Sequence, residues 1–249
     1  MLSIIICSID EQKFNFTSQM YARLLAGREF EIIRISDARS LSEGYNRGIR
    51  QSRGEHLLLC HDDLEILCNN FAERLFAHLP KCDILGVAGT DLLAGPSWIL
   101  AGPPHLYGQT ARPRSEGGGY TVAIYNSTNR FFGGMQALDG AWLAMHRHVF
   151  ERVQFDDILF NGFHNYDTDF TFTAYLAGMR LGVGTDIQNL HASGGNYDDN
   201  WKLYARRFNA KYLGKLPKPQ VREFNWNRIY AADKQGIIEI QTSPTWDRV

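Results

Sequence analysis

Two adjacent carboxylates and a histidine follow a short apolar run in the first quarter of the chain. The triplet His61-Asp62-Asp63 comes directly after His56–Cys60. Paired carboxylates after a buried strand can bind a hard divalent cation, whose remaining ligands are substrate phosphate oxygens. The chain contains neither a GxGxxG nor a GxxxxGKS/T sequence, so a phosphate site here would depend on a cation. Taken alone, an Asp-Asp pair is more often a solvated turn or a helix cap, and that alternative stays open at this point.

The apolar periodicity predicts an α/β fold that positions these carboxylates. Strands are expected over Leu2–Cys7, Phe30–Ile35, His56–Cys60, Ile84–Ala88 and Leu181–Val183. Helices are expected over Thr17–Leu25, from Ser40 to about Arg53, from about Asn70 to just before Pro80, and from about Thr168 to Gly178. Strands that alternate with helices indicate βαβ units and a mainly parallel sheet. Ligands bind beyond the carboxyl ends of such strands, where Asp10 and Asp37 also fall.

Residues 94–120 lack any helix or strand period. Ten of these 27 residues are Gly or Pro. A loop of this length inside a compact domain is usually functional or disordered. We expect it either to close over bound substrate as a lid or to be packed permanently by its own aromatic side chains.

Composition and charge exclude several classes of protein. The 249 residues are 44% apolar and carry 26 Lys or Arg against 27 Asp or Glu, for a net charge of −1. With this balance the chain lacks the excess of positive charge that nucleic-acid-binding proteins carry, so a nucleic-acid partner is not expected. The four cysteines show no CxxC spacing, which favours buried thiols in a reducing compartment. Because the N-terminal apolar run is too short for a signal peptide and no segment approaches a membrane span, we expect a cytoplasmic protein.

Three blocks of the sequence resemble the GT-A-fold nucleotide-sugar glycosyltransferases of the large family 2 type. The first block is SLSEGYNRGIRQSRGEHLLLCHDDLEI, in which Asn46-Arg47-Gly48 precedes Gly-Glu, an apolar strand and a DxD-type motif. The second block is LDGAWLAMHRHVFERVQFDDILFNGFHNYDTDFTFTAYLAGMRLGV, which is similar to the acceptor half of the same family. The third block, at 190–195, looks like the family's C-terminal metal-binding histidine. With the opening strand, the blocks span about residues 2–200.

The resemblance implies one glycosyltransferase domain over residues 1–249. Its core would be a mainly parallel, Rossmann-like sheet flanked by helices, with the long Gly/Pro-rich loop beside it. Residues 1–92 would form the nucleotide-binding half and residues 121–200 the acceptor-binding half. Residues 201–249 would form a C-terminal helical extension.

Two positions depart from the common family pattern. His61 stands where many members have Asp, and Tyr166-Asp167 stands where Glu-Asp is common. These departures indicate a subgroup with an H-x-D type metal motif. The resemblance assigns Mn²⁺ or Mg²⁺ to this chain, with Asp63 as the first candidate ligand, His191 as the second and His61 as the third.

The same resemblance implies catalytic and substrate-binding residues. Asp167 is the expected general base, which takes the proton of the acceptor hydroxyl, and Asp139 is the second catalytic candidate. The substrate-binding candidates are Ser8, Glu11, Asp37, Asn46, Asp62, Asp169 and Trp98. Among them, Ser8, Glu11 and Asp37 would surround the nucleotide base, and Asn46 would lie under the diphosphate. Alternatives stay open: Asp167 could cap its helix, Asp139 could belong to an ordinary turn, and Asn46 could be a helix-surface amide.

The resemblance therefore predicts an inverting, metal-dependent glycosyltransferase of the hexosyltransferase type. It would move a sugar from a UDP, GDP or dTDP donor to a hydroxyl of a glycan or lipid-linked acceptor, in surface polysaccharide synthesis. The basic, aromatic stretch 201–218 is typical of a helix on the inner membrane face, or of a helix that packs its aromatic residues on its own domain. Two other functions stay open: a metal-dependent nucleotidyltransferase or phosphohydrolase, and a non-catalytic nucleotide-sugar-binding module.

Overall fold

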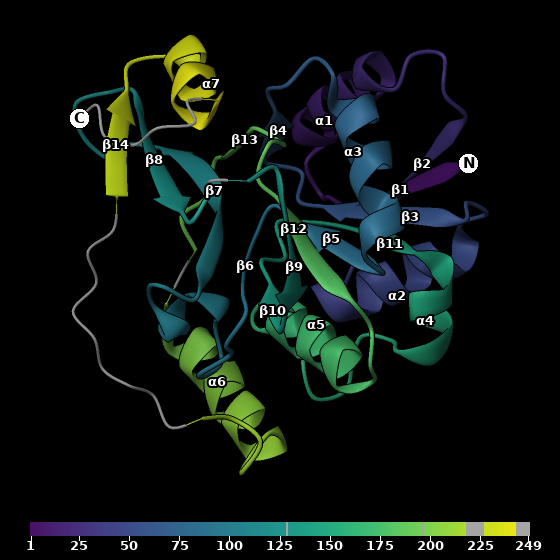
Figure 1. Ribbon diagram of the computed structural model, residues 1–249. Coiled ribbons are helices and arrows are strands. Elements are labelled where there is room, and N and C mark those ends of the chain that lie inside the picture. The colour runs from purple at the N-terminus through teal and green to yellow at the C-terminus, as the bar shows by residue number, and fades with distance from the viewer. Residues whose placement is uncertain (128, 196, 218–226, 243–249) are drawn as a thin grey trace.

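The computed structural model describes residues 1–127, 129–195, 197–217 and 227–242, and its centre is a seven-stranded mixed sheet (Figure 1). The strand order is β2-β1-β3-β11-β5-β12-β9. The bounds are β1 Leu2–Cys7, β2 Phe30–Ile35, β3 His56–Cys60, β5 Ile84–Gly86, β9 Phe131–Met135, β11 Trp142–His146 and β12 Leu181–Gly184. All strands except β11 and β9 run in one direction. The predicted α/β fold with a mainly parallel sheet is confirmed.

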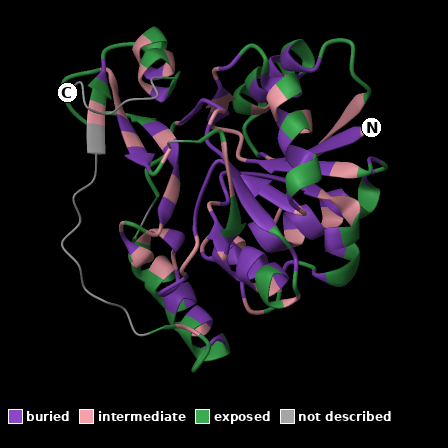
Figure 2. Cartoon of the chain, viewed as in Figure 1, coloured by how far each residue is buried: buried purple, intermediate pink, exposed green. Residues whose placement is uncertain are grey.

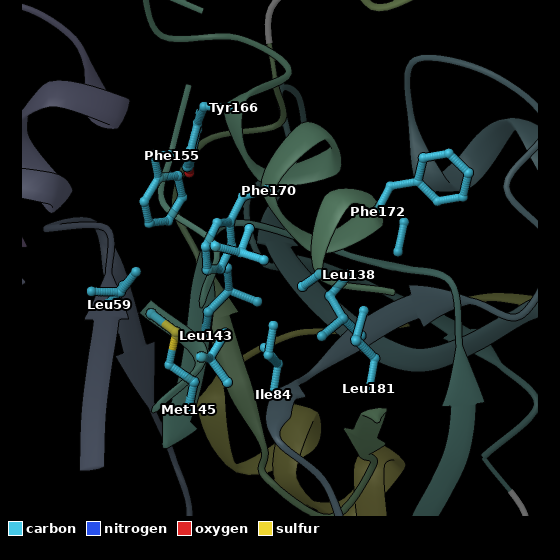
Figure 3. Close-up of a cluster of buried hydrophobic side chains, with 14 of the residues drawn as sticks. Leu59, Ile84, Leu138, Leu143, Met145, Phe155, Tyr166, Phe170, Phe172 and Leu181 are labelled. Atoms are coloured by element: carbon cyan, nitrogen blue, oxygen red, sulfur yellow. The ribbon is translucent and has the colours of Figure 1, made fainter. Parts of the chain in front are cut away.

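Helices cover both faces of this sheet, so its central strands are buried on both sides (Figures 1 and 2). One face carries α1 (Glu11–Leu24) and α3 (Phe71–His78), which share a core with β1 and β3. The other face carries α2 (Leu41–Gln51), α4 (Arg147–Arg152) and α5 (Tyr166–Leu176). Figure 3 shows part of that second core, where side chains of β3, β5, β11 and β12 meet those of α5. Continuous apolar runs such as LSIIIC are what strands buried on both faces require.

A second sheet stands beside the first. Its order is β10-β6-β7-β13-β4, with β8 paired to β7 and β14 paired to β8. The bounds are β4 Leu64–Ile66, β6 Ala88–Thr90, β7 Leu106–Pro113, β8 Tyr120–Tyr125, β10 Ala137–Leu138, β13 Asn189–His191 and β14 Asn227–Ala231. The strand expected over Ile84–Ala88 is in fact two strands, β5 and β6, because the chain passes from the first sheet to the second at Val87.

The prediction of an aperiodic loop over 94–120 is wrong for about half of that segment. It contains a short 3₁₀ helix, η2 (Trp98–Ala101), and the eight residues of β7. Strand β7 pairs with β6, β8 and β13, so long-range pairing overrides the strand-breaking effect of its glycine and proline residues. Strand β7 thus makes this segment part of the second sheet. This favours a permanently packed segment over a lid that closes on substrate.

Two helices begin earlier than the sequence predicts. Helix α1 starts at Glu11 rather than Thr17, because the Asp10 side chain accepts hydrogen bonds from the backbone N–H groups of Gln12 and Lys13. Asp10 therefore caps a helix. Helix α5 starts at Tyr166 rather than Thr168. A short 3₁₀ turn, η1 (Leu79–Lys81), follows α3.

The C-terminal part is not the helical extension expected for residues 201–249. Helix α6 (Asp199–Lys211) is followed by β14 and then α7 (Lys234–Thr242). The aromatic residues Tyr204, Phe208 and Tyr212 are buried in the core beneath α5, so the aromatic side of the 201–218 stretch packs on the protein itself. The last residue of that stretch, Lys218, together with 219–226 and 243–249, lies outside the described residues. Within the described ranges, no helix has the length and apolarity needed to cross a bilayer.

Candidate functional site

The edges of the two sheets bring the three predicted metal ligands together. Asp63 immediately precedes β4, and His191 ends β13, which pairs with β4. His61 directly follows β3. Nε2 of His191 lies 3.1 Å from Oδ1 of Asp63 and 3.2 Å from Nδ1 of His61, and Nδ1 of His61 lies 3.9 Å from Oδ1 of Asp63. One ligand atom from each residue is therefore within 4.8 Å of the other two.

These separations, and the protonation states of His61 and Asp63, fit one small divalent ion. With metal–ligand bonds of about 2.1 Å, two ligands at a right angle are roughly 3 Å apart. Burial, followed by the neighbouring His191, lowers the pKa of His61 to about 4, so this imidazole is neutral at pH 7. Although burial acts to raise it, the pKa of Asp63 is held well below its usual range by the hydrogen bond and charge of His191. A neutral imidazole and an ionised carboxylate are the forms that bind metal.

The backbone of Gly140 connects this cluster to Asp167. The Gly140 N–H donates to Oδ2 of Asp167 at 2.9 Å, and the Tyr166 hydroxyl donates to the Gly140 carbonyl at 3.1 Å. The same hydroxyl lies 2.7 Å from Nε2 of His61. A Cβ atom at position 140 would lie 2.3 Å from Cβ of Asp167 and 2.6 Å from the Tyr166 hydroxyl. Only glycine fits between these two side chains.

The environment of Asp167 suits a general base. Burial, and after it the charge of Asp139, raises the pKa of Asp167 to about 6. The Asp139 carboxylate is itself fixed, because it accepts hydrogen bonds from the Trp98 indole N–H and the Ala141 N–H, both at 2.9 Å. A carboxyl group with a pKa near neutrality can both hold and release a proton at working pH. The N-cap of α5 is Asn165 rather than Asp167, so the alternative that Asp167 serves as the cap is not realised.

One cavity of about 740 Å³ joins these groups. His61, His191, Asp139 and Asp167 all line it. Much of the remaining wall is aromatic and comes from η2, β8, the turn before α5, the segment before α6 and the first turn of α6. These residues are Trp98, Tyr125, Phe163, Tyr197 and Trp201. Trp98 is only 6% exposed, so most of its side chain is packed against the protein.

The candidates for nucleotide binding follow the carboxyl ends of β1, β2 and β3, outside this cavity. The Ser8 hydroxyl donates to Oδ2 of Asp62 at 2.6 Å, which ties the ends of β1 and β3 together. Asp37, whose side chain is 75% exposed, forms a two-point ion pair with Arg47. Glu11 forms an ion pair with Arg34. The structure thus gathers these side chains at the edge where α/β sheets bind ligands.

Two predicted substrate-binding residues are instead occupied by the protein's own groups. Asn46 is 2% exposed. Its side-chain amide donates a hydrogen bond to the carbonyl oxygen of Phe155 and accepts one from the Phe155 N–H. Asp169 is also 2% exposed, and its carboxylate accepts from Lys211 and from the Tyr212 hydroxyl. Neither residue lines the cavity. These contacts indicate that Asn46 and Asp169 hold elements together rather than touch substrate.

Comparison with known protein families identifies the chain. Residues 3–212 match the sequence model of a glycosyltransferase-like family. The chain belongs to this family. No curated protein matches the sequence. The relationship is nevertheless supported by the fold.

Solved glycosyltransferase structures share the fold at low sequence identity. The mannosyltransferase PcManGT from Pyrobaculum calidifontis, in complex with GDP-Man and Mn²⁺, has a TM-score of 0.51 and 11% identity, with 88% of this chain and 66% of that one covered. S. aureus TarS 1–349 in complex with UDP-GlcNAc has a TM-score of 0.51 and 12% identity, with 99% and 73% covered. This chain therefore has the GT-A fold of these glycosyltransferases, and it spans about two thirds of PcManGT and three quarters of that TarS fragment.

Sequence reasoning missed several residues of the candidate site. Gly140 and Tyr166 carry no catalytic signal of their own, and only the departure from Glu-Asp drew attention to position 166. Arg112 lines the cavity from β7, in a segment predicted to be loop. The Ser193 hydroxyl lies 3.0 Å from Nε2 of His191, and its place two residues after the histidine was the available signal.

Proposed function

We propose that this protein is an inverting, metal-dependent glycosyltransferase that moves a hexosyl group from a nucleoside-diphosphate sugar to an acceptor hydroxyl. One observation carries the proposal. The same cavity is lined by two candidate metal ligands, His61 and His191, and by Asp167, whose pKa is raised to about 6. A charge-neutralising centre for a leaving diphosphate and a proton acceptor for an attacking hydroxyl are the two groups that such a transfer requires.

Asp167 has the central role in the proposed reaction. As the acceptor oxygen forms its bond to the anomeric carbon, Asp167 takes the hydroxyl proton, and the bond to the leaving diphosphate oxygen breaks on the opposite face of the sugar. Burial, and after it the charge of Asp139, keeps the pKa of Asp167 high enough for this transfer. A divalent ion held by His61, Asp63 and His191 would supply neutralisation of the departing diphosphate.

The chemistry of the ligands favours Mn²⁺ over Mg²⁺. Two imidazoles and one carboxylate make up the cluster. Mg²⁺ prefers an all-oxygen environment, whereas imidazole nitrogen is a good ligand for later first-row ions. The complex of PcManGT with GDP-Man and Mn²⁺ is in keeping with this choice.

The donor and the acceptor are proposed from the shape of the site and from the comparisons. PcManGT was solved with GDP-Man, and TarS with UDP-GlcNAc, so UDP and GDP sugars are the first donors to test, followed by dTDP sugars. The aromatic wall of the cavity suits an acceptor that presents apolar sugar faces, such as a glycan or the sugar of a lipid-linked acceptor in surface polysaccharide synthesis. A cytoplasmic location and a membrane contact through 201–218 stay predictions.

Release of nucleoside diphosphate tests the proposal. Purified full-length protein is incubated with a panel of UDP-, GDP- and dTDP-sugars, with Mn²⁺ or with excess EDTA. We expect release from at least one donor with Mn²⁺ and none with EDTA. Asp63→Asn should abolish release, whereas Glu65→Gln, a nearby variant that only loses an ion pair with Lys234, should retain it. Full release in EDTA would refute the metal-dependent reaction.

The competing functions predict different results. A two-ion nucleotidyltransferase or phosphohydrolase needs a second cluster of ligands close to the first, but the part of the chain that the structure describes contains a single group of three ligating side chains. A non-catalytic module would bind a donor and release no diphosphate with any acceptor.

A further inference from the structure

The Tyr166 hydroxyl forms hydrogen bonds both to His61, a candidate metal ligand, and to the backbone. Tyr166 is not itself one of the candidate metal ligands. Its hydroxyl lies 2.7 Å from Nε2 of His61 and 3.1 Å from the carbonyl oxygen of Gly140. Its ring is 4% exposed and packs between Tyr45 and Phe155. Figure 3 shows Tyr166 beside Phe155 in the hydrophobic core. The ring therefore anchors the hydroxyl in one place.

The two hydrogen bonds of this hydroxyl determine which nitrogen of His61 carries the proton. The Gly140 carbonyl can only accept, so the single hydroxyl proton of Tyr166 must point to it. The hydroxyl oxygen then accepts from His61, which requires a proton on Nε2. In a neutral imidazole, Nδ1 is left with a free lone pair. Nδ1 is the atom that lies 3.2 Å from Nε2 of His191 and 3.9 Å from Oδ1 of Asp63.

We propose that Tyr166 is a positioning residue that fixes the tautomer and ring orientation of His61, so that Nδ1 presents its lone pair to the divalent ion. This inference rests on the metal site of the proposed function. Metal-binding histidines generally donate their second N–H to an oxygen, and that outer partner orients the ring. Here the outer oxygen belongs to the residue that precedes the proposed base.

The same pairing accounts for both departures from the common family pattern. His61 replaces an acidic ligand that needs no tautomer, and it therefore requires a partner on its far side. Tyr166 replaces the glutamate, and its hydroxyl is such a partner. Because Gly140 accepts from Tyr166 through its carbonyl and donates to Asp167 through its N–H, the backbone of one residue sets the positions of both the metal ligand and the base.

Tyr166→Phe tests the proposal, because it removes the hydroxyl and keeps the ring. The matched control is Tyr45→Phe, since the Tyr45 hydroxyl is buried in the same aromatic cluster and has no hydrogen-bond partner among the described residues. Mn²⁺ affinity of the full chain is measured without substrate by calorimetric titration. We expect a 10- to 100-fold weaker Kd for Tyr166→Phe and a change below about twofold for Tyr45→Phe. Equal Mn²⁺ affinity of Tyr166→Phe and the unsubstituted protein would overturn the role of Tyr166.

The tautomer of His61 gives a second test that needs no variant to fold. Nitrogen-15 NMR of histidine side chains in the metal-free protein should show His61 protonated at Nε2, and a proton on Nδ1 would overturn the proposal. Failure of the proposed function would look different: the unsubstituted protein would then bind no Mn²⁺ at all. Melting by circular dichroism establishes that each variant used is folded.

Discussion

Asp167→Asn should inactivate the enzyme and stabilise it at the same time. The substitution keeps the side-chain volume and an oxygen that can accept the Gly140 N–H bond. It removes the charge that burial and Asp139 make unfavourable. A loss of turnover by about 10² to 10⁴-fold is expected when a general base is removed. Donor affinity should be unchanged, because the substitution leaves intact the metal cluster and the nucleotide-binding candidates at the carboxyl ends of β1, β2 and β3.

The size of the stabilisation follows from the pKa of Asp167. The pKa rises from an ordinary value of 3.8 to about 6 on folding, so the ionised carboxylate costs about 3 kcal/mol, or about 2 kcal/mol once its partial exposure is allowed for. The folded state binds this proton more tightly than the unfolded state, so the cost is complete above pH 6 and vanishes below pH 4. The variant should therefore gain about 2 kcal/mol at pH 8, and this advantage should decline as the pH falls from 6 to 4.

Urea unfolding at pH 8 and pH 4.5, together with diphosphate release, measures both effects. Turnover of the unsubstituted protein should rise with pH through about 6, since the base must be ionised. Asp139→Asn is the companion variant, and it should move this rise to lower pH by removing the neighbouring charge. The reasoning would be refuted if the turnover of Asp167→Asn were within threefold of that of the unsubstituted protein, or if the variant were less stable than the unsubstituted protein at pH 8.

Three further substitutions test how the site is held. Asn46→Ala leaves a backbone N–H and a carbonyl unpaired, so the free energy of unfolding should fall by about 3 kcal/mol, while the KM of the folded enzyme for its donor should stay within threefold. Gly140→Ala places a Cβ atom 2.3 Å from that of Asp167, and we expect at least a tenfold loss of kcat, measured by diphosphate release. Lys211→Met leaves the buried Asp169 carboxylate without its cation and should cost about 3 kcal/mol in urea unfolding, with little effect on kcat.

The strands of the first sheet were predictable because their signal is local. Runs such as Leu2–Cys7 and His56–Cys60 have the continuous apolar character of strands buried on both faces. The second sheet was not predictable in the same way. Strand β7 contains Gly108 and Pro113 and is formed by pairing with β6, β8 and β13, contacts that no local pattern records.

The residues of the candidate site likewise fall into those marked by a local sequence motif and those whose role depends on long-range contacts. The clustering of His61, Asp63 and His191 could be predicted, because motifs in the right order mark them, and the fold brings one ligand atom of each within 4.8 Å of the other two. Asn46 and Asp169 could not be assigned, because their partners Phe155 and Lys211 lie 109 and 42 residues away. A polar residue in a motif is equally able to bind substrate or to bridge two elements, and only the folded chain distinguishes the two.

Binding of Mn²⁺ tests the central claim most directly. Room-temperature electron paramagnetic resonance measures the concentration of free Mn²⁺ while the full chain is titrated with Mn²⁺. The titration is done with and without a donor that supports turnover. The account predicts one tightly bound ion per chain, retained in Glu65→Gln and lost in both Asp63→Asn and His191→Ala. Stoichiometric binding that persists in Asp63→Asn and His191→Ala would contradict the assignment of the metal centre.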